Sequence, residues 1–306
     1  MAKIDKIVEL QNLLKQDPKN IQARRQLAIL LIDCGFSEEA LKNLLYLSKN
    51  IKNDSDIYYN LGIVYEKLKN LSKAKEAYEK SIEIAPLNID SIYNLGLVYT
   101  ELTEYEDAIK CFEFVIKRDP NDSNSYFNIG LIYFKQKDYP SAINYFQRTT
   151  DINNQDIYAH FYIGNILKEF GDKIGAREEF EKVISISPDY SWAYYNLAVI
   201  DYEEGNVDNA IDNLNTTIEL NPSDVEAYKI LTKILCKIKA YDEAEYIINQ
   251  ALDNIENNGD LLYIAGKVAF LQGDFDSYKN YLTEAMKNYK TLSISQKTIR
   301  DELSLL

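Results

Sequence analysis

Few residues of this sequence have the type and spacing that chemistry requires. The chain has one histidine, His160, and three cysteines, Cys34, Cys111 and Cys236. The cysteines form no CxxC pair and no disulfide framework, which disfavours a zinc site. No hydroxyl, thiol or carboxylate constellation recurs around His160, which disfavours nucleophilic or acid–base catalysis. We therefore expect His160 to pack between helices and the thiols to be free, with no metal, no cofactor and no enzymatic activity.

Phosphate-binding and paired-carboxylate motifs are missing as well. The sequence contains neither a GxGxxG motif nor a P-loop. Adjacent acids such as Glu178-Glu179 and Glu203-Glu204 are more typical of solvated helix faces than of catalytic pairs. The residues that could perform chemistry therefore give no basis for predicting an enzyme. The function must instead be inferred from the helices and their arrangement.

Composition and charge narrow the class of protein. In 306 residues, 34 Lys and Arg face 48 Asp and Glu, so the net charge is −14, which disfavours a general nucleic-acid binder. Apolar residues make up 46% and charged residues 27%, while only 11 Gly and 6 Pro occur, a composition that favours long helices around a packed core. Charges at Lys3, Asp5 and Lys6 interrupt the start, and no apolar stretch is long enough to span a bilayer. We expect no signal peptide, no membrane insertion and a cytoplasmic location.

A 34-residue period organises the chain. Five of the six prolines are separated by multiples of 34, namely Pro18, Pro86, Pro120, Pro188 and Pro222. The same register divides the chain into eight repeats without insertion: 21–54, 55–88, 89–122, 123–156, 157–190, 191–224, 225–258 and 259–292. Positions within each repeat are numbered 1–34 below. The remainders, 1–20 and 293–306, are expected to be N-terminal and C-terminal capping helices.

Other positions repeat in the same frame. Position 20 is Ala from Ala40 to Ala244, position 24 is apolar throughout, and position 8 is mostly Gly or Ala. Together with Leu or Ile at position 7, this pattern resembles the tetratricopeptide repeat family. The resemblance implies an all-α solenoid of helix-turn-helix repeats that forms an open superhelix.

The periodicity also predicts how the helices pack. Positions 4, 7, 8 and 11 share one stripe of a first helix, and positions 20, 24, 27 and 28 share one stripe of a second. Small residues at positions 8 and 20 would let the two helices approach closely. The N-terminal cap is expected to bury Ile7, Leu10, Leu13 and Leu14, which continue the register of the second helices. The C-terminal cap is expected to begin at Ser295 and to cover the last repeat with Ile299 and Leu303.

The resemblance implies a ligand-binding face. Tetratricopeptide first helices line a concave groove that usually binds peptides or partner proteins, so positions 2, 5, 6, 9, 12 and 13 would face the ligand. Position 6 carries asparagines that could pair with a peptide backbone, similar to the asparagine ladder in the repeats of O-linked N-acetylglucosamine transferase. Position 5 carries an aromatic row, for which packing between neighbouring repeats is the simpler interpretation. The residues predicted to contact a peptide are Tyr59, Asn60, Tyr93, Asn94, Phe127, Asn128, Tyr158, Phe161, Tyr162, Asn165, Trp192, Tyr195, Asn196, Tyr202 and Glu203.

A carboxylate clamp for chaperone tails is not expected. Position 9 of the groove is Asn only at Asn165, and the position 5 residue before it is Phe161 instead of a cation. The third repeat that such a clamp would need, 225–258, offers Glu226 and Ile230 where cations are required.

The most specific expectation concerns the partner's charge. No Lys or Arg occurs from Val183 to Tyr228, and this acidic window holds the only Trp, Trp192, at position 2. Aromatic faces beside carboxylates would favour a basic ligand with apolar anchors. The alternative is that acids such as Asp208 and Asp212 lie on second helices and serve solubility alone.

Asp201 departs from the repeat pattern. Position 11 is Leu or Tyr in most other repeats, so a carboxylate there is costly unless it is hydrogen-bonded or exposed. Two interpretations are open: local repacking with Tyr202 turned inward, or a functional acid.

These observations favour a non-catalytic scaffold that binds a protein or peptide in its groove. One alternative is a structural subunit that self-associates through its terminal helices, with Leu303, Leu305 and Leu306 as an adhesive surface. Another, which rests on family analogy, is a regulatory partner of a glycosyltransferase or a secretion machine.

Overall fold

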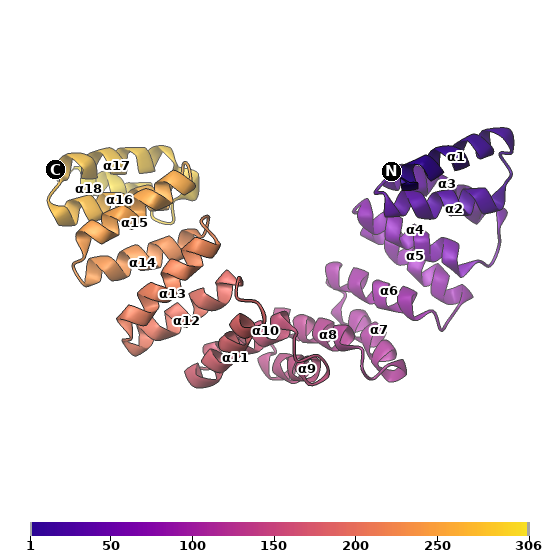
Figure 1. Ribbon diagram of the computed structural model, residues 1–306, viewed down its shortest axis with the longest axis horizontal. Helices are drawn as coiled ribbons and strands as arrows, with labels where there is room; N and C mark the ends of the chain where they lie inside the picture. Colours follow the sequence, from indigo (N-terminus) through magenta and orange to yellow (C-terminus); the bar gives the residue numbers. More distant parts are fainter. Residues whose placement is uncertain (1, 305–306) are drawn as a thin grey trace. The chain divides into compact units, whose positions relative to one another are not determined.

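The computed structural model describes residues 2–304 and is all-α over that range. No strand occurs among the described residues, and the helices form successive pairs joined by tight turns (Figure 1). The elements are α1 (Ala2–Gln16), α2 (Ile21–Asp33), α3 (Ser37–Asn50), α4 (Ser55–Lys67), α5 (Leu71–Ile84), α6 (Ile89–Glu101), α7 (Tyr105–Arg118), α8 (Ser123–Lys135), α9 (Tyr139–Ile152), α10 (Ile157–Glu169), α11 (Lys173–Ile186), α12 (Ser191–Glu204), α13 (Val207–Leu220), α14 (Val225–Lys237), α15 (Tyr241–Asn254), α16 (Gly259–Gln272), α17 (Phe275–Lys287), the 3₁₀ helix η1 (Tyr289–Thr291) and α18 (Gln296–Leu303).

The chain divides into two compact units, Met1–Ala159 and His160–Leu306. The first unit contains α1 to α9, the second contains α11 to α18, and the boundary falls inside α10. Within each unit a hairpin packs on the next one along the chain, as in a solenoid. No helix in residues 2–304 has the length and apolarity needed to cross a membrane.

Asparagine and aspartate start most of the first helices. At position 34, just before the next first helix, Asn20, Asn88, Asp122 and Asn258 each accept a hydrogen bond from the backbone N–H three residues on, at 2.9 to 3.1 Å. Such caps satisfy an N–H that the helix itself leaves unbonded. The first helices therefore begin where the period places an Asx residue.

A left-handed residue ends every first helix. Position 15 has a φ between 58° and 85° in all eight repeats: Gly35, Lys69, Thr103, Lys137, Gly171, Gly205, Lys239 and Gly273. The following N–H donates to the carbonyl of position 11, for instance Phe36 to Leu31 at 2.8 Å and Asn206 to Asp201 at 2.8 Å. This is the Schellman arrangement, which reverses the chain within a few residues.

Small residues at position 8 meet the aromatic ring at position 24 of the same repeat. A Cβ added to Gly62 would lie 2.4 Å from the ring of Tyr78, and one added to Gly130 would lie 2.8 Å from that of Phe146. Both rings are fully buried. The predicted close approach of the paired helices is therefore confirmed.

The buried stripe of the first helices differs from the expected one. Positions 4 and 11 are only half-buried in several repeats, as at Tyr58 and Tyr65. Positions 3 and 10 are buried instead, as at Ile57 and Val64, which are 1% and 0% exposed. A first helix packs against its own partner and against a neighbouring hairpin, so its apolar arc is wider than a single stripe.

The two ends are covered differently. At the start, α1 buries Ile7, Leu10 and Leu14, but Leu13 is 40% exposed, contrary to expectation, because α1 packs on the first core cluster through the other three residues. At the other end, Ile299 of α18 is buried and Leu303 packs partly against the last core cluster. Ser295 caps α18 as expected, since its side chain accepts a hydrogen bond from the N–H of Thr298. The two other leucines of the proposed adhesive surface, Leu305 and Leu306, lie outside the described residues.

Candidate functional site

The single histidine is a packing residue. His160 is 7% exposed, and its Nδ1 lies 2.6 Å from a carboxylate oxygen of Glu179. Burial opposes the charged form of Glu179, but hydrogen bonds to His160 and Lys182 hold the pKa of Glu179 below its ordinary value. The pair ties α10 to α11, and the expectation for His160 is confirmed.

Two of the three thiols are less acidic than an ordinary cysteine. Cys34, Cys111 and Cys236 are free and partly buried. Burial raises the pKa of Cys111 to about 12 and also raises the pKa of Cys236, so both remain protonated near neutral pH. Among residues 2–304, no cluster of three or more His, Cys, Asp or Glu could hold a metal ion.

Asp201 is a buried, fully paired carboxylate. It is 1% exposed and accepts hydrogen bonds from Arg177 at 2.7 Å and from Asn213 at 2.9 Å. Tyr202 packs partly against a core cluster, as the repacking interpretation expects, and accepts a hydrogen bond from Lys237. Asp201 is not displaced to the surface, however, and its hydrogen bonds in the interior join three helices, α11, α12 and α13.

The aromatic row at position 5 packs inside its own hairpins. Ring centroids lie 6.1 Å apart for Tyr59 and Tyr78, and 5.6 Å apart for Tyr93 and Phe112. The same pairing with position 24 recurs for Phe127 and Phe161, at 5.5 and 5.9 Å. Packing was the simpler expectation. The second helix of the same repeat is the recurring partner, and packing between neighbouring repeats also occurs, since the Phe127 ring lies 6.5 Å from that of Tyr158.

The asparagines at position 6 are partly engaged. The Nδ2 atoms of Asn60, Asn128 and Asn196 each donate to the carbonyl four residues earlier in their own helix, at 2.7 to 2.9 Å. Asn128 also donates to the hydroxyl of Tyr93 at 3.0 Å. Asn196 is 4% exposed and its Oδ1 accepts a hydrogen bond from Lys168, so its amide is occupied. Asn60, Asn94 and Asn128 are half-buried, as is Asn165 at position 9.

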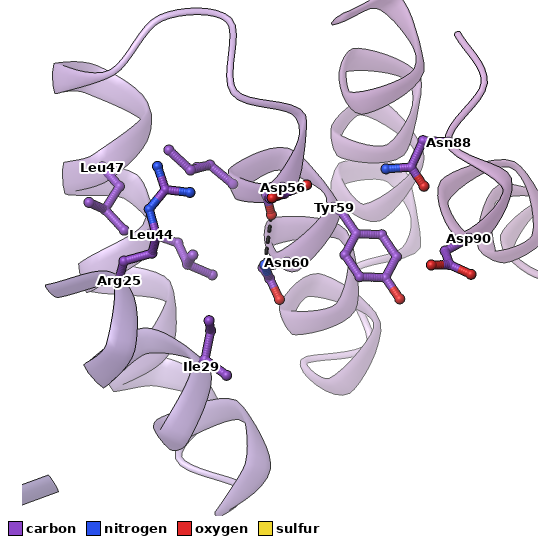
Figure 2. Close-up of a pocket in the computed structure, with 10 residues that line it drawn as sticks. Arg25, Ile29, Leu44, Leu47, Asp56, Tyr59, Asn60, Asn88 and Asp90 are labelled. Carbon is purple, nitrogen blue, oxygen red and sulfur yellow. Dashed lines mark hydrogen bonds between the residues drawn. The ribbon is translucent and has the colours of Figure 1, made fainter. Parts of the chain in front are cut away.

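In the first unit, a cavity of about 280 Å³ is lined by two of the predicted residues, Tyr59 and Asn60. Figure 2 shows Tyr59 and Asn60 of α4 between Arg25 on one side and Asp90 on the other. Arg25 also forms an ion pair with Asp54. The lining of this cavity therefore combines the aromatic ring of Tyr59 and the amide of Asn60 with a cation, Arg25, and an anion, Asp90.

In the second unit, Trp192 is the exposed aromatic residue of the predicted set. It is 48% exposed, and its ring meets that of Tyr195 edge-on with centroids 6.1 Å apart. Tyr195 and Tyr202 are half-buried and Glu203 is exposed. In the first unit Tyr158 is similarly accessible, at 54%, and lies 6.5 Å from Phe127. Phe161 and Tyr162, in the second, are half-buried and touch each other.

The acidic window around Trp192 is not electrically isolated. Cations from outside the window reach it from the preceding hairpin: Lys173 lies 2.9 Å from Glu203, and Arg177 lies 2.9 Å from Glu204. Two further acids of the window, Asp208 and Asp212, lie on the second helix α13, as the alternative to a ligand-binding role expected. Neighbours along the solenoid therefore supply cations to two acids of the window, Glu203 and Glu204.

A second cavity was missed by the sequence reasoning. It measures about 430 Å³ and lies between α14 and α16, where its lining includes Ile230, Ile264 and Lys233. The signal was present: position 6 is Ile in two successive repeats, and position 9 is Lys at Lys233 and Lys267. In most earlier repeats position 6 is Asn and position 9 is Ile, Leu or Val. The apolar and polar positions are thus exchanged in the last two repeats.

Comparisons with known proteins agree with the fold. Family models described as tetratricopeptide repeat match residues 1–57, 55–88, 93–157 and 167–235. A search of curated proteins finds no match to this sequence.

Many solved structures are similar in fold. The C-terminal part of a tetratricopeptide repeat-containing protein from Cytophaga hutchinsonii has a TM-score of 0.66 at 16% identity, covering 77% of this chain and 96% of that one. MamA from Desulfovibrio magneticus has a TM-score of 0.53 at 24% identity, covering 56% and 97%. YrrB, described as having an unusual peptide-binding site, has a TM-score of 0.51 at 24% identity, covering 61% and 96%.

Proposed function

Because the chain belongs to the tetratricopeptide repeat family, we propose that it is a non-catalytic scaffold whose first helices bind a peptide segment of a partner protein. The neighbours support a protein-interaction role: one is described by its peptide-binding site, and another, Cut9–Hcn1, is a hetero-tetrameric assembly. The free thiols, the buried His160–Glu179 pair and the buried Asp201 are all accounted for by packing.

The observation that carries this proposal is the exposure of Trp192. A large aromatic ring that is 48% exposed on a first helix offers apolar area at a position where earlier repeats carry Asp56, Asp90 or Asn124. Trp and Tyr dominate the energetics of most protein interfaces because they bury much area with few rotatable bonds. The ligand would contribute apolar anchors against Trp192 and Tyr195.

A basic ligand would gain less than the sequence alone indicates. Glu203 and Glu204 are already paired with Lys173 and Arg177, so an incoming Arg or Lys must compete with an existing ion pair. Exposed pairs of this kind contribute about 0–1 kcal/mol, so competition is feasible but adds little. Apolar anchoring is the main contribution in this proposal, and ligand cations are secondary.

The test uses a random-peptide display library selected on the full chain. Peptides retained by the wild type are rechecked on Trp192→Ala and on Tyr246→Ala, which removes a ring that is 69% exposed on the second helix α15. We expect peptides that lose binding to the first variant and keep binding to the second. Equal loss with both variants, or no peptide sensitive to Trp192, would overturn the proposal.

Self-association is a second candidate that one feature favours. The helix α1 exposes Ile4, Val8 and Leu13, at 47%, 50% and 40%, at one end of the first unit's stack. An apolar helix surface at the end of a stack is suited to a second copy. Light scattering over a concentration series tests it, with Val8→Glu as the variant, since a persistent monomer excludes self-association.

A further inference from the structure

The cavity between α14 and α16 differs in character from the rest of the first-helix face. Its apolar lining includes Ile230, Ile264 and Leu271, and half-buried Cys236 also lines it. This is an apolar hollow of about 430 Å³ within the second unit, large enough to receive one or two apolar side chains.

The charged groups around the cavity are mostly cations. Lys229, Lys233 and Lys267 line it, with Glu226 as the one acid of the lining. The chain as a whole has a net charge of −14, so three lysines around one apolar hollow run against the general surface charge. A ligand carboxylate would be selected here only by a lysine that is not already paired within the chain.

The three lysines are not equally available. Lys229 is paired with Glu226 at 2.8 Å and with Asp260 at 3.5 Å, and Lys267 is paired with Glu302 of α18 at 2.8 Å. Lys233 is exposed and has no carboxylate within salt-bridge distance among the described residues. Lys229 and Lys267 are thus already paired with carboxylates of the chain. Lys233 is left to pair with a carboxylate of a ligand.

One further polar group bears on the site. Thr232 contributes to the lining, is fully buried, and its hydroxyl has no hydrogen-bond partner in residues 2–304. Because Thr232 is fully buried, its hydroxyl is not a ligand contact in this structure, and the proposal below rests on the accessible groups of the lining.

We propose that the cavity between α14 and α16 is a second docking site, distinct from the Trp192 surface, for an acidic segment of a partner protein. The segment inserts apolar side chains onto Ile230, Ile264 and Leu271, and an adjacent Asp or Glu pairs with Lys233. The two surfaces carry different residues, so either proposal can fail without the other.

The experiment again uses a random-peptide display library on the full chain, now with Lys233→Glu as the discriminating variant. The matched control is Lys279→Glu, which makes the same charge change at an exposed position on the second helix α17. We expect a set of peptides rich in Leu, Ile or Phe beside Asp or Glu, whose affinity falls about tenfold on Lys233→Glu and is unchanged on Lys279→Glu and on Trp192→Ala. The proposal is overturned if no peptide depends on Lys233, if those that do are basic, or if they also require Trp192.

Cys236 provides a direct readout of occupancy. One synthetic peptide from the Lys233-dependent set is added, and alkylation by N-ethylmaleimide is followed at each cysteine by mass spectrometry. We expect alkylation of Cys236 to slow at least threefold while that of Cys34, in the first unit, is unchanged. Unchanged alkylation of Cys236 at saturating peptide would place the peptide elsewhere and overturn the proposal.

Discussion

The guanidinium of Arg177 in α11 lies 2.7 Å from the buried carboxylate of Asp201 in α12, and the same nitrogen lies 2.9 Å from Glu204. Asp201→Ala would leave Arg177 and Asn213 without their shared acceptor in the interior. Breaking one partner of a buried ion pair costs about 3–5 kcal/mol. We expect a loss of about 3 kcal/mol in the free energy of unfolding, measured by urea denaturation.

Glu204→Ala is the matched control for that prediction. Glu204 contacts the same guanidinium but is about one-third exposed, so its loss should cost less than about 1 kcal/mol. The Asp201→Leu, Arg177→Leu double variant should recover much of the stability lost by Asp201→Ala, because the only charge then left unpaired is that of Glu204, which is partly exposed to water. Equal costs for Asp201→Ala and Glu204→Ala would contradict the assignment of Asp201 as an interior anchor.

Gly62 and Gly266 occupy the same repeat position but should respond in opposite ways to alanine. A Cβ at Gly62 would lie 2.4 Å from the buried ring of Tyr78, whereas one at Gly266 would meet its nearest neighbours at 3.4 Å. Alanine gains about 1 kcal/mol over glycine in a helix, but overpacking costs about 1–3 kcal/mol. Gly62→Ala should therefore lower the melting temperature and Gly266→Ala should leave it unchanged or raise it. A rise for both would show that the Tyr78 ring yields.

The attachment of α18 should weaken in acid. Burial opposes the charged carboxylate of Glu302, but hydrogen bonds to Lys267, Tyr278 and Tyr263 hold its pKa below the ordinary value of 4.5. A lowered folded-state pKa means that the stabilisation is complete above about pH 4.5 and is lost as the pH falls through the lowered value. We expect hydrogen-exchange protection of α18, corrected for intrinsic rates, to fall over this window.

Glu302→Gln separates this effect from general acid unfolding. The variant should show reduced protection of α18 already at neutral pH and no further loss specific to α18 as the pH falls. If the wild type keeps full protection of α18 at pH 3 while the rest of the chain is folded, Glu302 contributes nothing to the docking of α18.

At the proposed surface around Trp192, we expect the loss of the aromatic ring to weaken peptide binding more than a change of charge at Glu203. Glu203 is exposed and already paired with Lys173, so Glu203→Lys should weaken binding of a Trp192-dependent peptide by no more than about fivefold. Trp192→Ala should weaken it by at least tenfold, because it removes buried aromatic area. Isothermal titration calorimetry in physiological salt measures both. If Glu203→Lys weakened peptide binding more than Trp192→Ala did, charge and not apolar contact would be the main contribution to binding.

The fold could be predicted in detail because its information is local and repeated. The period of 34, the small residues at position 8 and the apolar residue at position 24 act within single hairpins, and the structure places Gly62 against Tyr78 as that pattern requires. The exact buried arc could not be predicted, because burial at positions 3 and 10 depends on the neighbouring hairpin. Ile57 and Val64 are buried for that reason.

The candidate site was less predictable for the same physical reason. Lys173 and Arg177 stand well before the acidic window in sequence, yet lie against Glu203 and Glu204. The amide of Asn196 looked available in a linear pattern, but Lys168 of the preceding repeat occupies it. Contacts between repeats thus decide which groove positions remain free, and a single repeat does not contain that information.

The left-handed residue at position 15 has a consequence for how such a chain can change. Its φ lies between 58° and 85° in all eight repeats, although Lys69, Thr103, Lys137 and Lys239 stand where the others have Gly. Since the hairpins share one exit geometry, a hairpin can be exchanged for another, or duplicated, without rebuilding the turn inside it. Recombination in units of 34 residues would then move a surface carried by one hairpin, such as the exposed Trp192, as a single part, whereas the cavity between α14 and α16 would move only with both of its hairpins.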